Sequence, residues 1–163
     1  MITLMRATMD DAARLFEWRT DPATRGSSHS AGPVSFDHHR AWLERTLARP
    51  GVRLYVVIDP QREEWIGTCR LDREDRSAAI SLTVSPHARG QGYAGQILSA
   101  LQHEAIEWGV ERLTATVKPS NVASLRAFAA AGFQQYHGSD AGESVEFELL
   151  VAERPRASRS EPT

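Results

Sequence analysis

The hydrophobic and polar positions of the first fifty residues predict one strand followed by two helices. Apolar residues recur through residues 2–8, which favours a strand, and the acidic residues after Met9 are typical of the first turn of a helix. The inward side chains expected of this helix are Ala13, Phe16 and Trp18. Residues 21–33 are rich in Ser, Gly and Pro, which predicts a long irregular connection. Ser35 is then placed to cap a second helix over residues 36–48.

From residue 52 to residue 84 the pattern changes to short apolar runs separated by polar turns. The runs are LYVVI, WIGTCRL and AAISLTV. The polar stretches between them, DPQREE and DREDRS, are too short to hold a crossover helix. This part of the chain therefore predicts an antiparallel meander of three strands.

After Pro86 the apolar period becomes helical, and the remaining chain predicts a helix, a strand, a helix and two strands. The apolar stripe of the first helix is made of Ile97, Leu98, Leu101, Ala105 and Trp108. Gly109 is placed to end that helix, and a strand over residues 113–117 follows. The inward side chains expected of the next helix, over residues 121–131, are Val122, Leu125 and Phe128. The segments FQQYH and VEFELLV then alternate as two strands.

Length and composition bound the class of protein. The 163 residues suit a single domain, which we expect over residues 1–152, followed by a disordered polar tail over residues 153–163. A net charge of -2 and a pI near 6.3 argue against a nucleic-acid partner. The absence of a signal peptide and of any apolar run of about 18 residues predicts a cytoplasmic protein without a membrane partner. Cys69 is the only cysteine, which excludes an intramolecular disulfide and a thiolate metal cluster.

The segment SLTVSPHARGQGYAGQIL carries the clearest chemical signal, a strand that leads through glycines into a helix. Gly90 and Gly92 allow the backbone to approach a bulky anion, and the free amides of a helix start attract phosphate. Taken alone, the loop is equally well explained as a turn without a ligand. The glycines also fit the dinucleotide pattern GxGxxG, but that fold needs parallel units and an acidic residue about 20 positions on. Residues 113–118 hold no carboxylate, and no Lys-Ser or Lys-Thr pair follows the glycines as a P-loop requires.

These residues resemble the GCN5-related N-acetyltransferase superfamily, whose coenzyme loop has Arg or Gln, two residues, Gly, one residue, and Gly or Ala. Arg89, Gly92 and Ala94 fill this form. The predicted order of elements is also similar to that of the superfamily over residues 2–152. The resemblance implies a mixed α/β (α+β) fold with a mostly antiparallel, twisted sheet of about seven strands and about four helices. It also implies that the sheet is splayed between its fourth and fifth strands, through a bulge.

The resemblance implies that acetyl-CoA is the co-substrate, with no metal. The amides from Gly90 to Gly95 are then expected to hold its pyrophosphate, and the edge of the preceding strand is expected to pair with pantetheine. The residues this assigns to the donor site are Leu82, Thr83, Val84, Arg89, Gly90, Gln91, Gly92, Tyr93, Ala94, Gly95, Asn121, Ser124 and Phe128.

The segment KPSNVASLRAFAAAGF resembles the second signature of the superfamily, in which an asparagine opens a helix beside pantetheine and a Gly-Phe pair closes it. Asn121 fits this position, although an ordinary helix cap explains it as well. Many members have a tyrosine seven residues later that protonates the leaving thiolate, where this chain has Phe128. A thiol with a pKa of about 8.5 leaves readily as its anion, so this acid is not indispensable. Ser124 and Tyr136 are alternative donors, although a solvated helix serine and a strand aromatic are the favoured explanations of these residues.

The acceptor side is less defined. An alkyl ammonium must lose a proton before it attacks, so a base is expected near the splay. Thr116 stands where some relatives have a glutamate base and cannot serve as one. The candidates by residue type alone are Asp72, His29, His38 and His39.

The N-terminal half resembles acetyltransferases of nucleotide-sugar biosynthesis of the pseudaminic acid pathway type, and it shares its opening with ribosomal-protein-type and aminoglycoside relatives. The residues that carry the resemblance are Trp18, Arg19, Asp21, Pro22, His39 and Trp42, with Thr20 in place of the usual asparagine. It implies that Trp18, Arg19, Arg25 and Arg70 face an anionic acceptor. Tryptophans that pack the two helices and a surface ion pair at Arg19 explain the same residues.

The function expected from these observations is direct transfer of acetyl from acetyl-CoA to a primary amine of a small molecule, such as an amino sugar or a nucleotide-linked amino sugar. Cys69 lies in an apolar strand, which argues against a covalent acyl-enzyme. The alternatives are acetylation of a protein N-terminus or of an aminoglycoside, and a non-catalytic module that binds acyl-CoA. A monomer and a homodimer are both compatible with the sequence.

Overall fold

The computed structural model describes residues 1–22, 24, 34–136 and 144–151. Most of the connection expected over residues 21–33 lies outside these ranges, as do Arg25, His29 and the C-terminal tail. The elements, in chain order, are β1 (Thr3–Arg6), η1 (Met9–Asp11), α1 (Ala12–Thr20), α3 (Phe36–Ala48), β2 (Val52–Asp59), β3 (Glu64–Glu74), β4 (Ser77–Val84), η2 (Pro86–Ala88), α4 (Tyr93–Glu107), β5 (Arg112–Val117), α5 (Val122–Ala130), β6 (Gln134–Tyr136) and β7 (Val145–Leu150).

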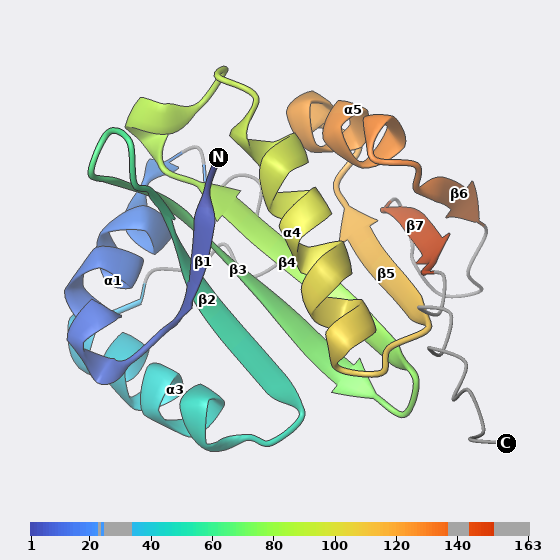
Figure 1. The fold of residues 1–163 in the computed structure, drawn as a ribbon. Coiled ribbons are helices and arrows are strands. Elements are labelled where there is room, and N and C mark those ends of the chain that lie inside the picture. The colour runs from blue at the N-terminus through green and yellow to red at the C-terminus, as the bar shows by residue number, and fades with distance from the viewer. Residues whose placement is uncertain (23, 25–33, 137–143, 152–163) are drawn as a thin grey trace, which may run out of the picture.

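Seven strands form one sheet in the order β1-β2-β3-β4-β5-β7-β6 (Figure 1). All neighbouring strands run antiparallel except β4 and β5, so the expected meander and mixed fold class are confirmed. Strands β4 and β5 pair only over Ser77–Ala79 and Arg112–Thr114. Beyond these residues the two strands separate, which is the splay that the resemblance implied.

The prediction of a bulge at the splay is wrong. Strand β4 pairs with β3 without a shift in register, from Gly67 opposite Val84 to Glu74 opposite Ser77. The sheet's register shift lies instead between β2 and β3, at Val57 and Ile58. The opening therefore needs no extra residue, because β4 stays fully paired with β3 while its pairing with β5 ends after three residues.

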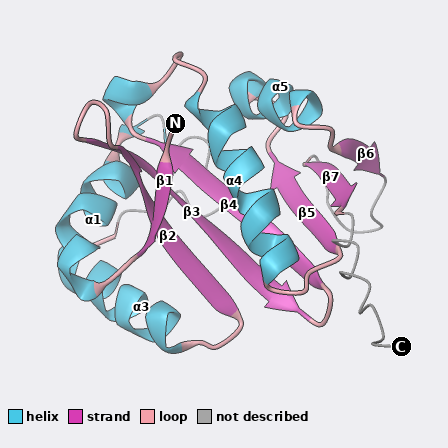
Figure 2. Ribbon diagram, viewed as in Figure 1, coloured by secondary structure: helices cyan, strands magenta, loops and turns pink. Residues whose placement is uncertain are grey.

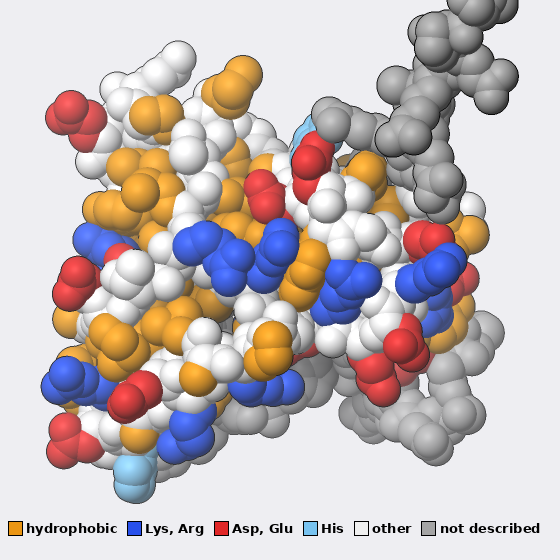
Figure 3. All heavy atoms as spheres, turned by 60° about the horizontal axis from the view of Figure 1, so that its bottom comes forward, with side chains coloured by type: hydrophobic (Ala, Val, Ile, Leu, Met, Phe, Trp, Pro, Cys, Tyr) orange, Lys and Arg blue, Asp and Glu red, His pale blue; other side chains and the backbone are white. Residues whose placement is uncertain are grey.

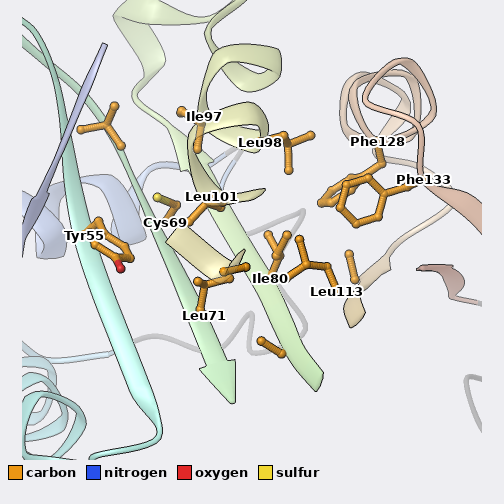
Figure 4. Close-up of a cluster of buried hydrophobic side chains, with 14 of the residues drawn as sticks. Tyr55, Cys69, Leu71, Ile80, Ile97, Leu98, Leu101, Leu113, Phe128 and Phe133 are labelled. Carbon is orange, nitrogen blue, oxygen red and sulfur yellow. The ribbon is translucent and has the colours of Figure 1, made fainter. Parts of the chain in front are cut away.

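Helices α4 and α5 lie on one face of the sheet and enclose the larger core (Figure 2). The apolar stripe predicted for α4 is confirmed, since its side chains pack on buried residues of β3, β4 and β5 (Figure 4). Those from α4 are Ile97, Leu98, Leu101 and Ala105, and those from the strands include Leu71, Ile80 and Leu113. This packing fixes the axis of α4, and with it the position of the glycine loop that precedes the helix.

Helices α1 and α3 pack on the opposite face, against β2, in a smaller cluster that includes Leu15, Trp18, Leu43 and Leu54. The bounds predicted for α3 are confirmed, and Ser35 caps it by accepting a hydrogen bond from the His38 amide. None of the helices in the described ranges is long and apolar enough to cross a membrane.

Two predictions of inward-facing residues are wrong. In α1 the buried residues are Ala12, Leu15 and Trp18, whereas Ala13 is exposed. The 3₁₀ turn η1, with three residues per turn, precedes α1 and changes the phase of the stripe. In α5, Val122 is half exposed because it occupies the first turn, and Phe128 carries the packing.

Candidate functional site

The glycine loop joins β4 to α4 and has a backbone that favours glycine at two positions. Gly90 has a φ of 75° and Gly92 a φ of 80°, in the left-handed region that residues with a Cβ rarely adopt. A Cβ built at either position has no atom within 4 Å, so the space in front of the loop is open. Helix α4 has no side-chain cap at its N-terminus. The first-turn amides are thus available for an anion, as the pyrophosphate prediction requires.

The side chain of Tyr93 anchors this loop from the inside. It is 6% exposed, and its hydroxyl donates to Asp59 Oδ2 over 2.7 Å. This hydrogen bond lowers the pKa of Asp59 and raises that of Tyr93. Asp59 Oδ1 also accepts from the amide of Gln61 at the β2–β3 turn. Only the backbone of Tyr93 therefore faces a ligand, and the sequence analysis missed Asp59, whose place at the end of a strand was the available signal.

A second contact ties the loop to the same turn. Arg62 donates to Gln91 Oε1 over 2.8 Å, and Gln91 Nε2 donates to the His87 carbonyl over 3.2 Å. The β2–β3 turn thus holds the loop at two points. The side chain of Gln91 is occupied within the loop, which leaves its backbone amide for the predicted contact with pyrophosphate.

The side chain of Arg89 connects the loop to the residues after α1. Its guanidinium donates to the Val84 carbonyl over 3.2 Å, to Asp21 Oδ2 over 3.1 Å and to Thr24 Oγ1 over 2.8 Å. The hydrogen bond from the Thr24 amide, and to a lesser extent the one from Arg89, lowers the pKa of Asp21 below its usual value. Asp21 belongs to the stretch whose resemblance suggested an acceptor site, so the loop predicted to bind the donor contacts the segment predicted to face the acceptor.

The strand edge predicted to pair with pantetheine lies beyond the last residue of β4 that pairs with β5. The partly exposed residues Leu82, Thr83 and Val84 follow Ala79, where this pairing ends. Their other edge is fully paired with β3. Gly67 permits this close pairing, because a Cβ there would lie 2.4 Å from the Thr83 carbonyl oxygen. The structure therefore offers a backbone edge that another extended chain can join.

Helix α5 begins at Asn121, whose Oδ1 accepts from the Ser124 amide over 3.2 Å. The helix-cap interpretation is thus observed, and contact of Asn121 with pantetheine remains a prediction. Ser124 is partly exposed. Phe128 is 4% exposed and lies between two rings, edge-on to Phe133 at 5.0 Å and stacked on Phe147 at 5.5 Å. Phe128 is a core residue, which explains how a ring without a hydroxyl is accommodated here.

The acceptor candidates of the first two helices are mostly buried. Trp18 is 6% exposed, and Trp42 partly covers the same cluster. His39 is 2% exposed, and burial, followed by the charge of Arg19, lowers its pKa. A buried neutral imidazole between Phe16 and Trp42 is poorly placed to meet an external amine. His38 is exposed, and Arg19 is partly exposed.

The remaining candidates are the acceptor-side residues Arg70 and Asp72 and the candidate proton donor Tyr136, and they lie on the sheet face that carries α1 and α3. Arg70 forms an ion pair with Asp72 over 2.7 Å, and its guanidinium lies 5.9 Å from the ring of Trp42. Tyr136, on β6, lies under the guanidinium of Arg112 at 5.3 Å. These residues flank the splay from its two sides, Arg70 and Asp72 on β3 and Tyr136 at the far edge of the sheet. Within the described residues no group of three or more His, Cys, Asp or Glu side chains is placed to hold a metal ion.

Comparisons with known proteins agree with this geometry. The family model described as acetyltransferase (GNAT) domain matches residues 2–134. The fold is similar to that of spermidine N-acetyltransferase from Vibrio cholerae, solved with CoA and spermine, with a TM-score of 0.81 and 16% identity over 92% of this chain and 95% of that one.

It is also similar to aminoglycoside acetyltransferase AAC(6')-Ib in complex with coenzyme A, with a TM-score of 0.78 and 19% identity over 92% of this chain and 95% of that one. A domain from Methanocaldococcus jannaschii has a TM-score of 0.80 and 15% identity, over 92% of this chain and 98% of that one. No curated protein sequence matches the chain significantly. The family match spans most of the chain and includes the splay and the glycine loop, and the chain therefore belongs to the GNAT family of acetyl-CoA-dependent N-acetyltransferases.

Proposed function

We propose that this protein transfers the acetyl group of acetyl-CoA directly to a primary amine of a small molecule. The observation that carries the proposal is the opening between β4 and β5 next to the uncapped start of α4. The extended pantetheine arm, which ends in the thioester, can lie along the opening between the strands, while the pyrophosphate meets the amides at the start of α4. The acceptor then approaches the same opening from the opposite face of the sheet.

The donor half follows from the backbone. In the proposed complex the amides from Gly90 to Gly95 bind the pyrophosphate, and the edge at Leu82–Val84 pairs with pantetheine. The open space in front of Gly90 and Gly92 supports this arrangement, because a side chain there would take the volume the phosphates need. The contacts of Tyr93 and Gln91 with the β2–β3 turn hold the loop in place before the ligand arrives.

Direct transfer is supported by the state of the one thiol in the chain. Cys69 is 2% exposed, and burial raises the pKa of its thiol well above the usual range. A thiol that is neither ionised nor accessible cannot attack the thioester. The amine therefore attacks the acetyl carbon itself, and the CoA thiolate leaves.

The charges around the splay favour a cationic amine over a nucleotide-linked one. Arg70, assigned by resemblance to an anionic acceptor, is already neutralised by Asp72. At the end of the sheet where β4 and β5 are still paired, Arg76 and Arg112 also form ion pairs with glutamates. The space-filling view brings the bottom of Figure 1 forward, and on this side Lys and Arg side chains form a row with acidic side chains beside it (Figure 3). The structural neighbours acetylate spermidine and aminoglycosides, so a polyamine or an amino sugar is the acceptor class we propose.

Release of free thiol from acetyl-CoA, measured with a panel of amines, tests this proposal. The panel contains spermidine, kanamycin, glucosamine, a nucleotide-linked amino sugar and a peptide with a free N-terminus. We expect turnover with at least one of the first three and weaker turnover with the last two. Binding of acetyl-CoA without thiol release from any amine would support the non-catalytic module instead.

A further inference from the structure

Glu146 has a buried carboxylate oxygen to which none of the contacts described so far contributes a hydrogen bond. Its Oε2 atom is buried and has no hydrogen-bond partner in the described part of the chain. A buried carboxylate oxygen without a partner is costly, and in native proteins such atoms often mark a functional site. The alternation in VEFELLV puts Glu146 on the face opposite Val145 and Phe147, but only the strand order shows what lies next to it.

The strand order places Glu146 beside the splay, on the acceptor face. It is directly opposite Thr116 on β5 and Tyr136 on β6, and residues paired in this way share a face. Thr116 is two residues beyond Thr114, where β5 ceases to pair with β4. On the other side of the opening, Arg70 of β3 is paired with Ser81 of β4. One row of side chains thus crosses the sheet, interrupted only by the opening.

Glu146 differs from two other carboxylates on this face, Asp72 and Glu148, in having no cationic partner among the described residues. Asp72 pairs with Arg70 over 2.7 Å, and Glu148 pairs with Arg112 over 2.9 Å. None of the ion pairs of the described residues includes Glu146. Of these three carboxylates, Glu146 is therefore the one whose negative charge no arginine neutralises and a cationic amine can.

We propose that Glu146 is the carboxylate that binds the ammonium group of the acceptor and takes its proton. The proton moves from the ammonium to Glu146, which leaves a neutral amine with a free electron pair. That pair forms the carbon–nitrogen bond to the acetyl carbon, the carbon–sulfur bond breaks, and CoA leaves as the thiolate. The second proton on nitrogen neutralises the thiolate, and Glu146 returns its proton to solvent.

This inference rests on the proposed function, and the variant Glu146→Gln tests it with the best amine of the panel. We expect kcat/KM for the amine to fall by about 100-fold or more, while KM for acetyl-CoA and the thermal midpoint stay close to those of the wild type. Glu146→Asp, which keeps the carboxylate, should retain more activity. With an acceptor whose amine is already neutral at pH 7, the loss in Glu146→Gln should shrink, an effect that a merely structural role would not produce.

Glu148→Gln is the matched control, because it removes the same charge from the same strand and face but from a carboxylate that already pairs with Arg112. Its loss of activity should be much the smaller of the two. If the wild type is active and both variants lose activity equally, or Glu146→Gln loses none, the assignment of Glu146 is overturned and the proposed function remains intact. Absence of turnover with every amine in the wild type would overturn both.

Discussion

The substitution Gly67→Ala tests whether the edge of β4 holds the donor. A Cβ at this position would lie 2.4 Å from the Thr83 carbonyl oxygen and 3.3 Å from the Cα of Val84, whereas Cβ contacts below 3.0 Å essentially do not occur. Backbone atoms cannot rotate away, so Thr83 must move outward by roughly 0.6 Å or more. Overpacking of this kind costs about 1–3 kcal/mol of unfolding free energy.

The displaced residues are those proposed to pair with pantetheine, so the substitution should impair catalysis as well as stability. Misplacement of a bound reactant by about 1 Å can reduce the rate by roughly 100-fold, and we expect kcat/KM for acetyl-CoA to fall by about 10-fold to 100-fold. Urea unfolding gives the stability and initial rates at varied acetyl-CoA give KM.

Gly109→Ala is the control for lost stability. Its φ of 80° makes any Cβ there strained by about 1–2 kcal/mol, and it lies at the far end of α4 from the glycine loop. We expect this variant to unfold more easily and to keep its KM for acetyl-CoA. If Gly67→Ala is destabilised but keeps the wild-type kcat/KM for acetyl-CoA, the β4 edge is not part of the donor site.

Three further predictions concern single side chains and a glycine. His39→Leu removes a group whose pKa is lowered in the folded state. As the pH drops below 6.5, the unfolding free energy of the wild type should therefore decrease more steeply than that of the variant, by up to about 1.4 kcal/mol per pH unit. Tyr93→Phe removes the donor that lowers the pKa of Asp59; the variant should therefore unfold at lower urea at pH 7, with a difference that shrinks as the pH falls below 3.8. Gly92→Ala should raise KM for acetyl-CoA and leave KM for the amine unchanged in steady-state assays, because the new Cβ occupies the open space in front of the loop.

Much of the fold could be predicted from local patterns. Helix α3 has the bounds expected from its cap and its apolar period, and the meander follows from turns too short for a crossover. The phase of α1 could not be predicted, because the turn η1 depends on the capping box formed by Thr8 and Asp11. A period alone does not show where a helix changes from three residues per turn to 3.6.

The proposed donor and acceptor halves of the site differ in how far the sequence reveals them. The proposed donor half is contiguous, since the strand edge, the glycines and the start of α4 follow one another along the chain. The proposed acceptor half is assembled by pairing of distant strands. Glu146 comes to lie next to Thr116 only because β7 inserts between β5 and β6, and Asp59 meets Tyr93 across 34 residues. Neither contact can be found from a sequence motif, because each joins residues that are far apart along the chain.

A crystal structure of the chain with CoA shows whether the glycine loop and the edge of β4 bind acetyl-CoA together. We expect diphosphate oxygens hydrogen-bonded to backbone amides between Gly90 and Gly95, with pantetheine paired along Leu82–Val84 and its thiol at the opening next to Ala79. CoA bound at another surface, with this loop and strand edge free of contacts to it, would refute the proposed donor site.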